Sequence, residues 1–556
     1  RIEVIRGPGG SIWGANAMNG IINIITKNSA QTQGAYFSQV LGDDDNSITE
    51  VRYGGKTQDL NTYRVYAKRA LRGPLERLND GSTNVDGSVN NRSGSNFDGI
   101  SSSRGGFRYD ITSIENNAIK IRGDFFKTES RNYFQGINTA EGNMHKENTG
   151  GNIVLNWDKT VSSKSRTSLQ TYLYYDRNDA VIADYKETIL DVDFQHFYDF
   201  SDRNSFTWGI GYKNLIDDIQ SNSVVDPAGA SYIPLNYIPS ERNISVVSAF
   251  IQDKYAIIPK DLFVTIGSKF EHNEQTGFEY QPSVRLKYFP DRNQTLWAAA
   301  SRAIRTPTRG EDNIEIRSVV GVNNILVTRG SNRAVSETVI SYEMGYRIKP
   351  NNKTLADISL FFNEYDNLGN FDADMTNAVN LGLGGLSGTP TASNTGRAKS
   401  YGLEFTGKWQ ATNNLRFEVG YDFLKVDIDL DAASNENNDT ASALNADRLI
   451  FFENMSPKNQ FRFRSFYNIT PKIEFDNMLY YVDYLEGRSA GGITENDIPS
   501  YVRWDTRLGY LASNNIDLSV GVQNILDDRH TEYTPGLFNN RVEIGRTYYG
   551  KISLQF

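Results

Sequence analysis

Arginines gather in one polar stretch of the chain, near residues 304–335. The six guanidinium groups within or beside it are Arg302, Arg305, Arg309, Arg317, Arg329 and Arg333. A guanidinium offers a planar set of N–H donors that suits an anionic ligand. Glu311, Asp312 and Glu315 lie in the same stretch. Two interpretations therefore stay open: the arginines bind an anionic ligand, or they pair with these carboxylates.

A second group of charged residues is acidic. Asp427, Asp429 and Asp431 share one face of a predicted strand, and further oxygen donors follow at Asn435, Glu436 and Asp439. Carboxylate oxygens are the ligands that calcium prefers, although no EF-hand spacing or glycine accompanies them. The sequence leaves a calcium site and a solvated acidic face both open.

Residues for catalysis or for a resident cofactor are scarce. The chain has no cysteine, and its four histidines are His145, His196, His272 and His530. They form no HExxH pair, no Ser-His-Asp arrangement and no GxSxG elbow. The net charge of -9 argues against a nucleic-acid binder. We expect a protein that is not an enzyme and has no cofactor, unless calcium binds.

The elements that must position these residues are strands. Polar and apolar residues alternate in many segments; within 117–127, Ile119 and Ile121 share one face while Lys120 and Arg122 share the other. We count about 22 such strands between residues 34 and 556. The chain has 31 tyrosines, 29 phenylalanines and 6 tryptophans, enough aromatic rings for a girdle at each membrane interface. The mean hydropathy of -0.51 is compatible with strands that face lipid on one side only.

Connections between these strands alternate in length. Tight turns are predicted at 201–204, 259–261, 290–293, 350–352, 412–414 and 513–515. Long polar segments are predicted at 71–103, 128–149, 214–240, 304–335, 367–396 and 429–454. A soluble β-sandwich fits the composition but not this asymmetry. The pattern predicts an all-β fold, a transmembrane antiparallel up-and-down β-barrel, whose even strand count places both termini in the periplasm.

Residues 1–27 differ from the strands that follow. Gly7, Gly14 and Gly20 permit tight turns inside a crowded lumen, and barrels of this size are plugged. A phosphate-binding loop is the alternative, but the stretch lacks the Gly-Lys-Ser/Thr ending and Pro8 removes an amide.

The string IEVIRGP at 2–8, with GANAMNG and INIITK after it, resembles the closing segment of the plug domain of TonB-dependent receptors. The motif residues are Arg6, Gly7, Pro8, Gly14, Gly20 and Asn23. Further resemblance to the family lies at 301–307, 336–347, 522–529 and 545–549. It implies a plug remnant at 1–33 and a 22-stranded outer-membrane barrel at 34–556, with most of the N-terminal plug lacking.

The resemblance also implies a function, namely energised uptake of a scarce solute across the Gram-negative outer membrane. A ferric siderophore is the favoured solute, as transported ligand; cobalamin or another large solute is the alternative. Haem is disfavoured, because 304–307 and 330–333 lack the FRAP and NPNL elements of haem receptors. Implied partners are the lipid bilayer, a TonB-type energy-transducing protein if a full plug is present, the metal chelate, and phage or colicin ligands. A passive pore or a surface-anchoring barrel is the competing function.

Overall fold

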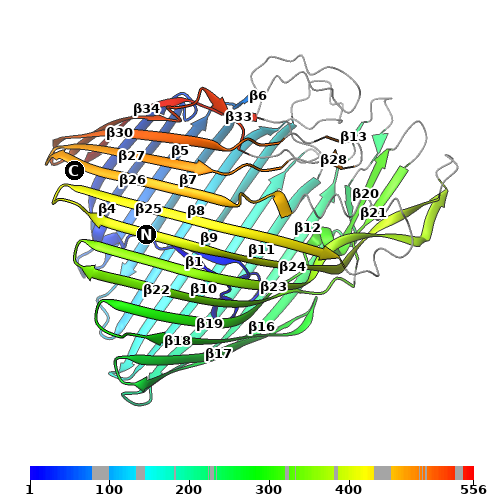
Figure 1. The fold of residues 1–556 in the computed structure, drawn as a ribbon, viewed down its shortest axis with the longest axis horizontal. Coiled ribbons are helices and arrows are strands. Elements are labelled where there is room, and N and C mark those ends of the chain that lie inside the picture. The colour runs from blue at the N-terminus through cyan, green and yellow to red at the C-terminus, as the bar shows by residue number, and fades with distance from the viewer. Residues whose placement is uncertain are drawn as a thin grey trace.

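A closed β-barrel makes up nearly all of the protein (Figure 1). The computed structural model describes residues 1–77, 99–132, 144–180, 183–222, 224–225, 231–232, 235–319, 325–331, 333–380, 386–430, 453–486, 489–490, 493–494, 497–532 and 542–556. Within these residues, 22 wall strands each pair antiparallel with the next. The predicted fold class is confirmed.

The wall strands follow one another around the barrel in chain order. They are β3 (Gly34–Gly42), β4 (Ser47–Lys56), β5 (Thr62–Arg72), β7 (Ile100–Ile111), β8 (Asn117–Asn132), β9 (Met144–Ser162), β10 (Ser165–Asp179), β11 (Ala183–Asp199), β12 (Asn204–Ser221), β16 (Glu241–Ile258), β17 (Leu262–Asn273), β18 (Gly277–Tyr288), β19 (Gln294–Arg305), β22 (Glu337–Asn351), β23 (Thr354–Asn380), β24 (Leu386–Gln410), β25 (Leu415–Leu430), β26 (Asn459–Thr470), β27 (Ile473–Val482), β30 (Tyr501–Ser513), β31 (Ile516–Gln523) and β34 (Thr547–Gln555).

Short elements lie in the connections. They are β6 (Glu76–Arg77), β13 (Val224–Val225), β14 (Ser231–Tyr232), β15 (Leu235–Tyr237), α2 (Arg309–Asn313), β20 (Ile314–Val319), β21 (Ile325–Arg329), β28 (Ser489–Ala490), β29 (Ile493–Thr494), β32 (Arg529–His530) and β33 (Val542–Gly545). None of the helices in the described residues has the length and apolar character to cross a bilayer.

The first and last wall strands close the sheet. β3 pairs with β34 from Tyr36↔Gln555 to Gly42↔Tyr549. Ala35 N–H donates to the Phe556 carbonyl at 3.0 Å, and Phe556 N–H donates back to the Ala35 carbonyl at 2.9 Å. Closure pairs backbone groups that an open edge would expose to lipid.

The wall of the barrel has polar side chains on its inner face and apolar side chains on its outer face. On β17, Lys269 and Glu271 are buried, while Ile266 and Phe270 on the opposite face are 58% and 40% exposed. Side chains alternate across a strand, so the polar set lines the lumen and the apolar set forms the outer face. This is the arrangement expected of a barrel in lipid.

Short and long connections gather at opposite ends of the barrel (Figure 1). The prediction of a long loop at 367–396 was wrong, because β23 continues to Asn380 and β24 begins at Leu386. The loop prediction rested on the Gly, Ser, Asn and Asp content of this segment, but Phe371, Ala373 and Met375 alternate with polar residues as in a strand. Antiparallel pairing between β23 and β24 extends this hairpin.

Residues 1–27, called the lumen segment here, form a small hairpin. Its strands β1 (Ile2–Arg6) and β2 (Gly20–Ile24) pair antiparallel, and α1 (Gly10–Trp13) lies between them. The turn α1 contacts β17, β18 and β19. A short 3-10 helix, η1 (Ser29–Thr32), then leads into β3.

Candidate functional site

The turn at α1 is held by buried polar side chains of the wall. Ala15 N–H donates to Glu271 Oε2 at 2.9 Å, and Gln281 Nε2 donates to the same oxygen at 2.6 Å. Ser11 and Ser283 join through their hydroxyls at 2.9 Å. Buried polar groups need such partners. Glu271 and Ser283 therefore each hold one group of the turn, and Gln281 holds Glu271.

Two glycines let the lumen segment approach these carboxylates. Gly7 and Gly14 have φ of 72° and 81°, the left-handed region that glycine enters without steric cost. A Cβ at Gly7 would overlap the Glu343 carboxylate, and one at Gly14 would lie 2.7 Å from Glu271 Oε1. Both positions require glycine, because any other residue would strain the backbone there and its Cβ would collide with a carboxylate.

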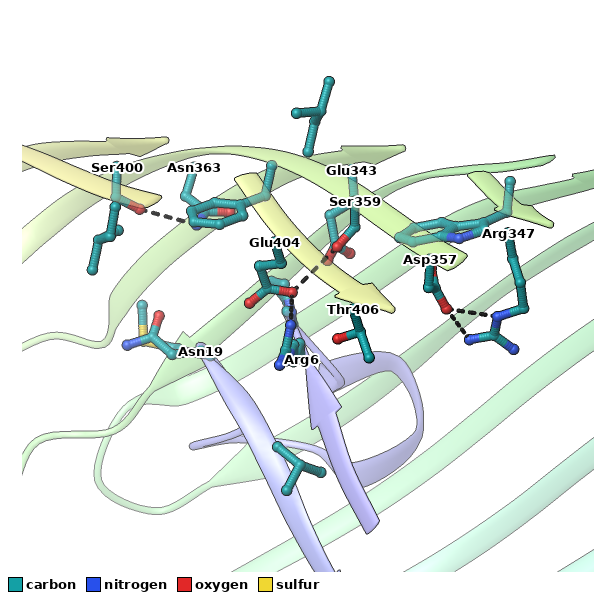
Figure 2. Close-up of a pocket in the computed structure, with 18 of the residues that line it drawn as sticks. Arg6, Asn19, Glu343, Arg347, Asp357, Ser359, Asn363, Ser400, Glu404 and Thr406 are labelled. Atoms are coloured by element: carbon teal, nitrogen blue, oxygen red, sulfur yellow. Dashed lines mark hydrogen bonds and ion pairs between the residues drawn. The ribbon is translucent and has the colours of Figure 1, made fainter. Parts of the chain in front are cut away.

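An ion pair joins β1 to the wall on the opposite side of the hairpin. Arg6 pairs with Glu404 of β24, and Figure 2 shows its guanidinium aimed at that carboxylate. Asp422 lies 3.9 Å from the same Arg6 nitrogen and pairs with Arg462 at 2.8 Å. Arg6 therefore completes a chain of charges that runs from the lumen segment into β26.

Apolar and polar contacts fix the stretch before β2. Met18 packs against Ala303 and Val339, both fully buried. Tyr365 donates its hydroxyl to Asn19 Oδ1 at 2.8 Å. This small core joins the lumen segment to β19, β22 and β23.

The exit of the lumen segment is anchored separately. Ser29 N–H donates to Asp110 Oδ2 at 2.7 Å, and Arg108 donates from Nε to the same carboxylate at 2.9 Å. Arg108 Nη1 also donates to Thr26 Oγ1 at 2.9 Å. The chain is thus tied to β7 just before η1 and at the first residue of η1.

Polar cavities lie beside the lumen segment. One of about 880 Å³ separates it from β22–β24 and has charged lining from Glu343, Arg347 and Asp357 (Figure 2). Another of about 360 Å³ lies toward β10–β12 and is lined by Tyr172 and Lys213 among others. These volumes lie within the range of about 300–1,000 Å³ that is usual for small-molecule sites.

At the long-loop end, Arg305 is bound by two carboxylates. Its Nε lies 2.7 Å from Glu337 Oε2, and its Nη2 lies 2.6 Å from Glu311 Oε1. Thr308 caps α2 through a reciprocal pair with Glu311. Burial alone would raise the pKa of Glu311, but hydrogen bonds from Arg305 and Thr308 outweigh it and lower this pKa.

A second ion network lies beside this one. Arg309 Nε is 3.3 Å from Asp217 Oδ1, and Arg242 is 3.7 Å from Asp217 and 3.1 Å from Asp312. Asp217 is only 2% exposed. Burial raises the pKa of Asp312, although Arg242 and Arg309 partly oppose this. The first network holds α2 against β19 and β22, and the second holds it against β12 and β16.

Comparison with known families decides the identity of this barrel. The family model described as TonB dependent receptor-like, beta-barrel matches residues 29–525. The chain belongs to the TonB-dependent receptor family. Its members are outer-membrane transporters and not enzymes, so the predicted family and the predicted lack of enzymatic function are confirmed.

Relatives of this TonB-dependent receptor include two curated proteins. The chain is 22% identical to the iron-regulated outer membrane virulence protein of Vibrio cholerae, covering 100% of this chain and 79% of that one. It is 24% identical to the ferric enterobactin receptor of Pseudomonas aeruginosa over 66% of this chain and 55% of that one. A crystal structure of a mutant of that receptor with enterobactin has a TM-score of 0.76 at 16% identity, covering 100% and 86% of the two chains.

The arginines predicted to bind ligand are dispersed in this TonB-dependent receptor. Arg305 and Arg309 lie in the two ion networks. Arg329 pairs with Glu315 at 3.1 Å and keeps half of its side chain exposed. Arg333 is exposed and has no ion pair with any described residue. Arg302 lies on the outer face, and the Arg317 side chain lies outside the described part. Ligand binding by these arginines stays a prediction.

The predicted calcium residues are only partly described. Asp427 pairs with Lys425 at 3.0 Å on β25, and Asp429 is exposed on the same strand. Asp431, like the oxygen donors after it, lies outside the described residues. Within the part that the structure describes, no group of three metal-ligating side chains comes together. Calcium binding also stays a prediction.

The plug-motif residues lie together in the hairpin. Pro8 follows Gly7 beside the larger cavity, Gly20 pairs with Arg6, and Asn23 Nδ2 donates to Glu3 Oε2 at 3.0 Å. Their partners on the wall, above all Glu271 and Glu404, were not predicted from the sequence. Alternation could have placed both side chains in the lumen, but their pairing spans hundreds of residues.

Proposed function

We propose that this TonB-dependent receptor takes up a ferric siderophore, driven by a TonB-type protein of the inner membrane. The observation that carries the proposal is the set of contacts between the lumen segment and the wall, from Arg6–Glu404 to Ala15–Glu271. A passive pore has no need of a segment bound inside its lumen. Hydrogen bonds and ion pairs, unlike an apolar core, can exchange for water when the segment is pulled.

The substrate class rests on chemistry and on the relatives. Two relatives carry names that refer to iron or to ferric enterobactin. At the long-loop end, Arg329 and Arg333 keep exposed guanidinium groups that suit an anionic ferric chelate. Arg305 and Arg309 serve instead to shape the loop, because carboxylates already occupy them.

The proposed orientation places the long loops outside the cell. Outer-membrane barrels have short periplasmic turns and longer extracellular loops. The last wall strand ends with the short turns, so both termini lie in the periplasm, where a TonB-type protein acts. In this arrangement residues 1–33 belong to the plug domain and residues 34–556 form the barrel.

Uptake by cells tests the proposal. The complete gene product is expressed in cells that lack their own siderophore receptors, and radiolabelled ferric enterobactin and cobalamin are supplied in turn. We expect accumulation of the ferric chelate that stops when TonB is deleted. Accumulation that persists without TonB would favour a passive pore, and uptake of cobalamin alone would overturn the siderophore assignment.

A further inference from the structure

Glu279 is a buried carboxylate of the wall that lacks a partner in the described part of the chain. It lies on the lumen face of β18, is 9% exposed and lines the cavity of about 360 Å³ beside α1. No hydrogen bond or ion pair joins its side chain to a described residue. Glu271 lies directly opposite on β17 and adds a second negative charge. A carboxylate taken out of water needs a cation or N–H donors to replace its hydration.

The cations that line this cavity, called the Glu279 cavity here, each face another carboxylate. These pairs are Lys269 with Glu271 at 3.9 Å, Arg242 with Asp312 at 3.1 Å, and Lys213 of β12 directly opposite Asp191 of β11. Asp193 also lines the cavity and accepts a hydrogen bond from Gln195 Nε2 at 2.8 Å. Within the described lining, Glu279 has neither a cation opposite it nor a hydrogen-bond donor. The cavity therefore contains one carboxylate that is open to a ligand.

Aromatic rings share the cavity with Glu279. Trp13 of α1 lines it and is 49% exposed, and Tyr172 of β10 lines it from the wall. The face of an aromatic ring attracts a cation, and it does so most strongly where water is excluded. An ammonium group combines a compact positive charge with three N–H donors. A carboxylate together with aromatic rings therefore suits an ammonium group, whereas a neutral or anionic group would leave Glu279 without compensation.

The Glu279 cavity lies between the lumen segment and the long-loop end of the wall. Arg242, near the start of β16, and Thr306, just after β19, line it at that end, and Asn16 lines it from the lumen segment. Its volume is near the lower limit of small-molecule sites, so it matches one arm of a large solute. A solute that enters from the long loops can place an arm here while the rest stays outside the cavity.

We propose that this receptor selects ferric chelates that carry a primary ammonium group, and that Glu279 accepts hydrogen bonds from this group inside the Glu279 cavity. The inference rests on the proposed uptake of a ferric chelate and adds the charge of one of its arms. The anionic iron centre and the cationic arm then meet opposite charges, Arg329 and Arg333 at the long loops and Glu279 in the lumen. The bound arm also contacts α1, since Trp13 and Glu279 line the same cavity.

Calorimetric titration of the complete gene product in detergent tests the inference. The probes are three synthetic ferric tris-catechol chelates on one scaffold, whose single side arm ends in a primary amine, in the acetylated amine or in the succinylated amine. Glu279→Gln removes the charge with little change of shape, and Glu279→Lys reverses it. Glu418→Gln is the matched control, because Glu418 lies outside the lining of the Glu279 cavity. Heat-modifiable migration in gels confirms that each variant is folded.

We expect the wild-type receptor to bind the amine chelate about tenfold more tightly than the acetylated chelate, the scale of one charge-assisted hydrogen bond. Glu279→Gln should abolish this preference, and Glu418→Gln should keep it. Glu279→Lys should instead prefer the succinylated chelate, which a purely structural role of Glu279 would not produce.

Equal binding of the amine and acetylated chelates by the wild-type receptor would overturn the inference, as would a preference that survives Glu279→Gln. Either result leaves the proposed function intact, because TonB-dependent accumulation of ferric enterobactin reports that function separately. Absence of binding by all three chelates, together with absence of that accumulation, would overturn both.

Discussion

Glu271 of β17 accepts the backbone N–H of Ala15 at 2.9 Å, across the boundary between wall and lumen segment. The same carboxylate oxygen accepts from Gln281 of β18 at 2.6 Å. Gly14, directly before Ala15, lies so close that a side chain there would press on Glu271. One buried carboxylate of the wall thus determines the position of the turn that follows α1.

Replacement of Glu271 by alanine should loosen this turn. The substitution leaves the Ala15 N–H and the Gln281 amide without an acceptor, which costs about 1–3 kcal/mol for buried donors. We expect hydrogen exchange of amides 10–16 to accelerate by about tenfold or more. Glu418→Ala is the control, because among the described residues Glu418 pairs only with Lys408 and Arg416 of the wall. Equal protection of amides 10–16 in Glu271→Ala and Glu418→Ala would contradict the assigned role.

Gly7 should tolerate alanine less well than Gly277. Both have φ near +75°, but a Cβ at Gly277 meets open space whereas one at Gly7 overlaps Glu343. The backbone cost, about 1 kcal/mol, is common to both. We expect Gly7→Ala to lower the unfolding midpoint in urea further than Gly277→Ala. The double variant Gly7→Ala/Glu343→Ala should recover that difference, and failure to recover it would show that the carboxylate is not the obstacle.

The fold was largely predictable from sequence because the barrel repeats one local rule. Alternation identifies a strand wherever one face touches lipid, as on β8 with Ile119 and Ile121 opposite Lys120 and Arg122. The rule was missed where the composition is typical of a loop. Residues 367–396 are rich in Gly, Ser, Thr, Asn and Asp, and this composition predicted a loop although Phe371, Ala373 and Met375 alternate with polar residues within β23.

The candidate site was less predictable because it depends on long-range pairing. Arg6 was singled out by its motif, yet nothing local identifies Glu404 as its partner. For the arginines near residues 304–335, the sequence left two interpretations open, namely binding of an anionic ligand or pairing with nearby carboxylates. For Arg305 and Arg309 the structure supplies carboxylate partners, one of which, Asp217, comes from a distant strand.

Arg309 and Arg333 should behave differently when replaced by alanine. Arg309 pairs with the buried Asp217 and donates to the carbonyls of Pro239 and Ser240. Its loss should lower the free energy of unfolding by about 1–3 kcal/mol, because a buried carboxylate loses a partner. Arg333→Ala should leave unfolding in urea unchanged and weaken ferric-siderophore binding if it contacts the chelate. The reverse pattern would contradict both assignments.

The stability of the loop that contains α2 should depend on pH, because Glu311 titrates in this loop. Its pKa is lowered in the folded loop, so its contribution is present above its ordinary pKa and lost as pH falls through the lowered value. Burial raises the pKa of Asp312, so protonation of Asp312 at low pH favours the folded loop and opposes the effect of Glu311. The chain has no cysteine, so Arg333→Cys provides a unique spin-label site next to Ser331, whose N–H donates to the Glu311 carbonyl at 2.7 Å.

We expect this label to become more mobile as the pH falls from about 5 to below 4. Adding Glu311→Gln should make it mobile at neutral pH as well. A label whose spectrum is constant with pH, in both backgrounds, would exclude Glu311 as the titrating group.

Solute passage should require the lumen segment to leave its contacts with the wall, and a reversible lock can test this requirement. The hydroxyls of Ser11 and Ser283 are 2.9 Å apart, so Ser11→Cys/Ser283→Cys should form a disulfide that fastens α1 to β18. The control Ser102→Cys/Thr128→Cys joins two wall strands at a pair 3.0 Å apart. TonB-dependent uptake of ferric enterobactin is measured before and after reduction. We expect the oxidised lock to abolish uptake, reduction to restore it and the control to transport throughout. Full uptake by the oxidised lock would show that the segment does not need to leave the wall.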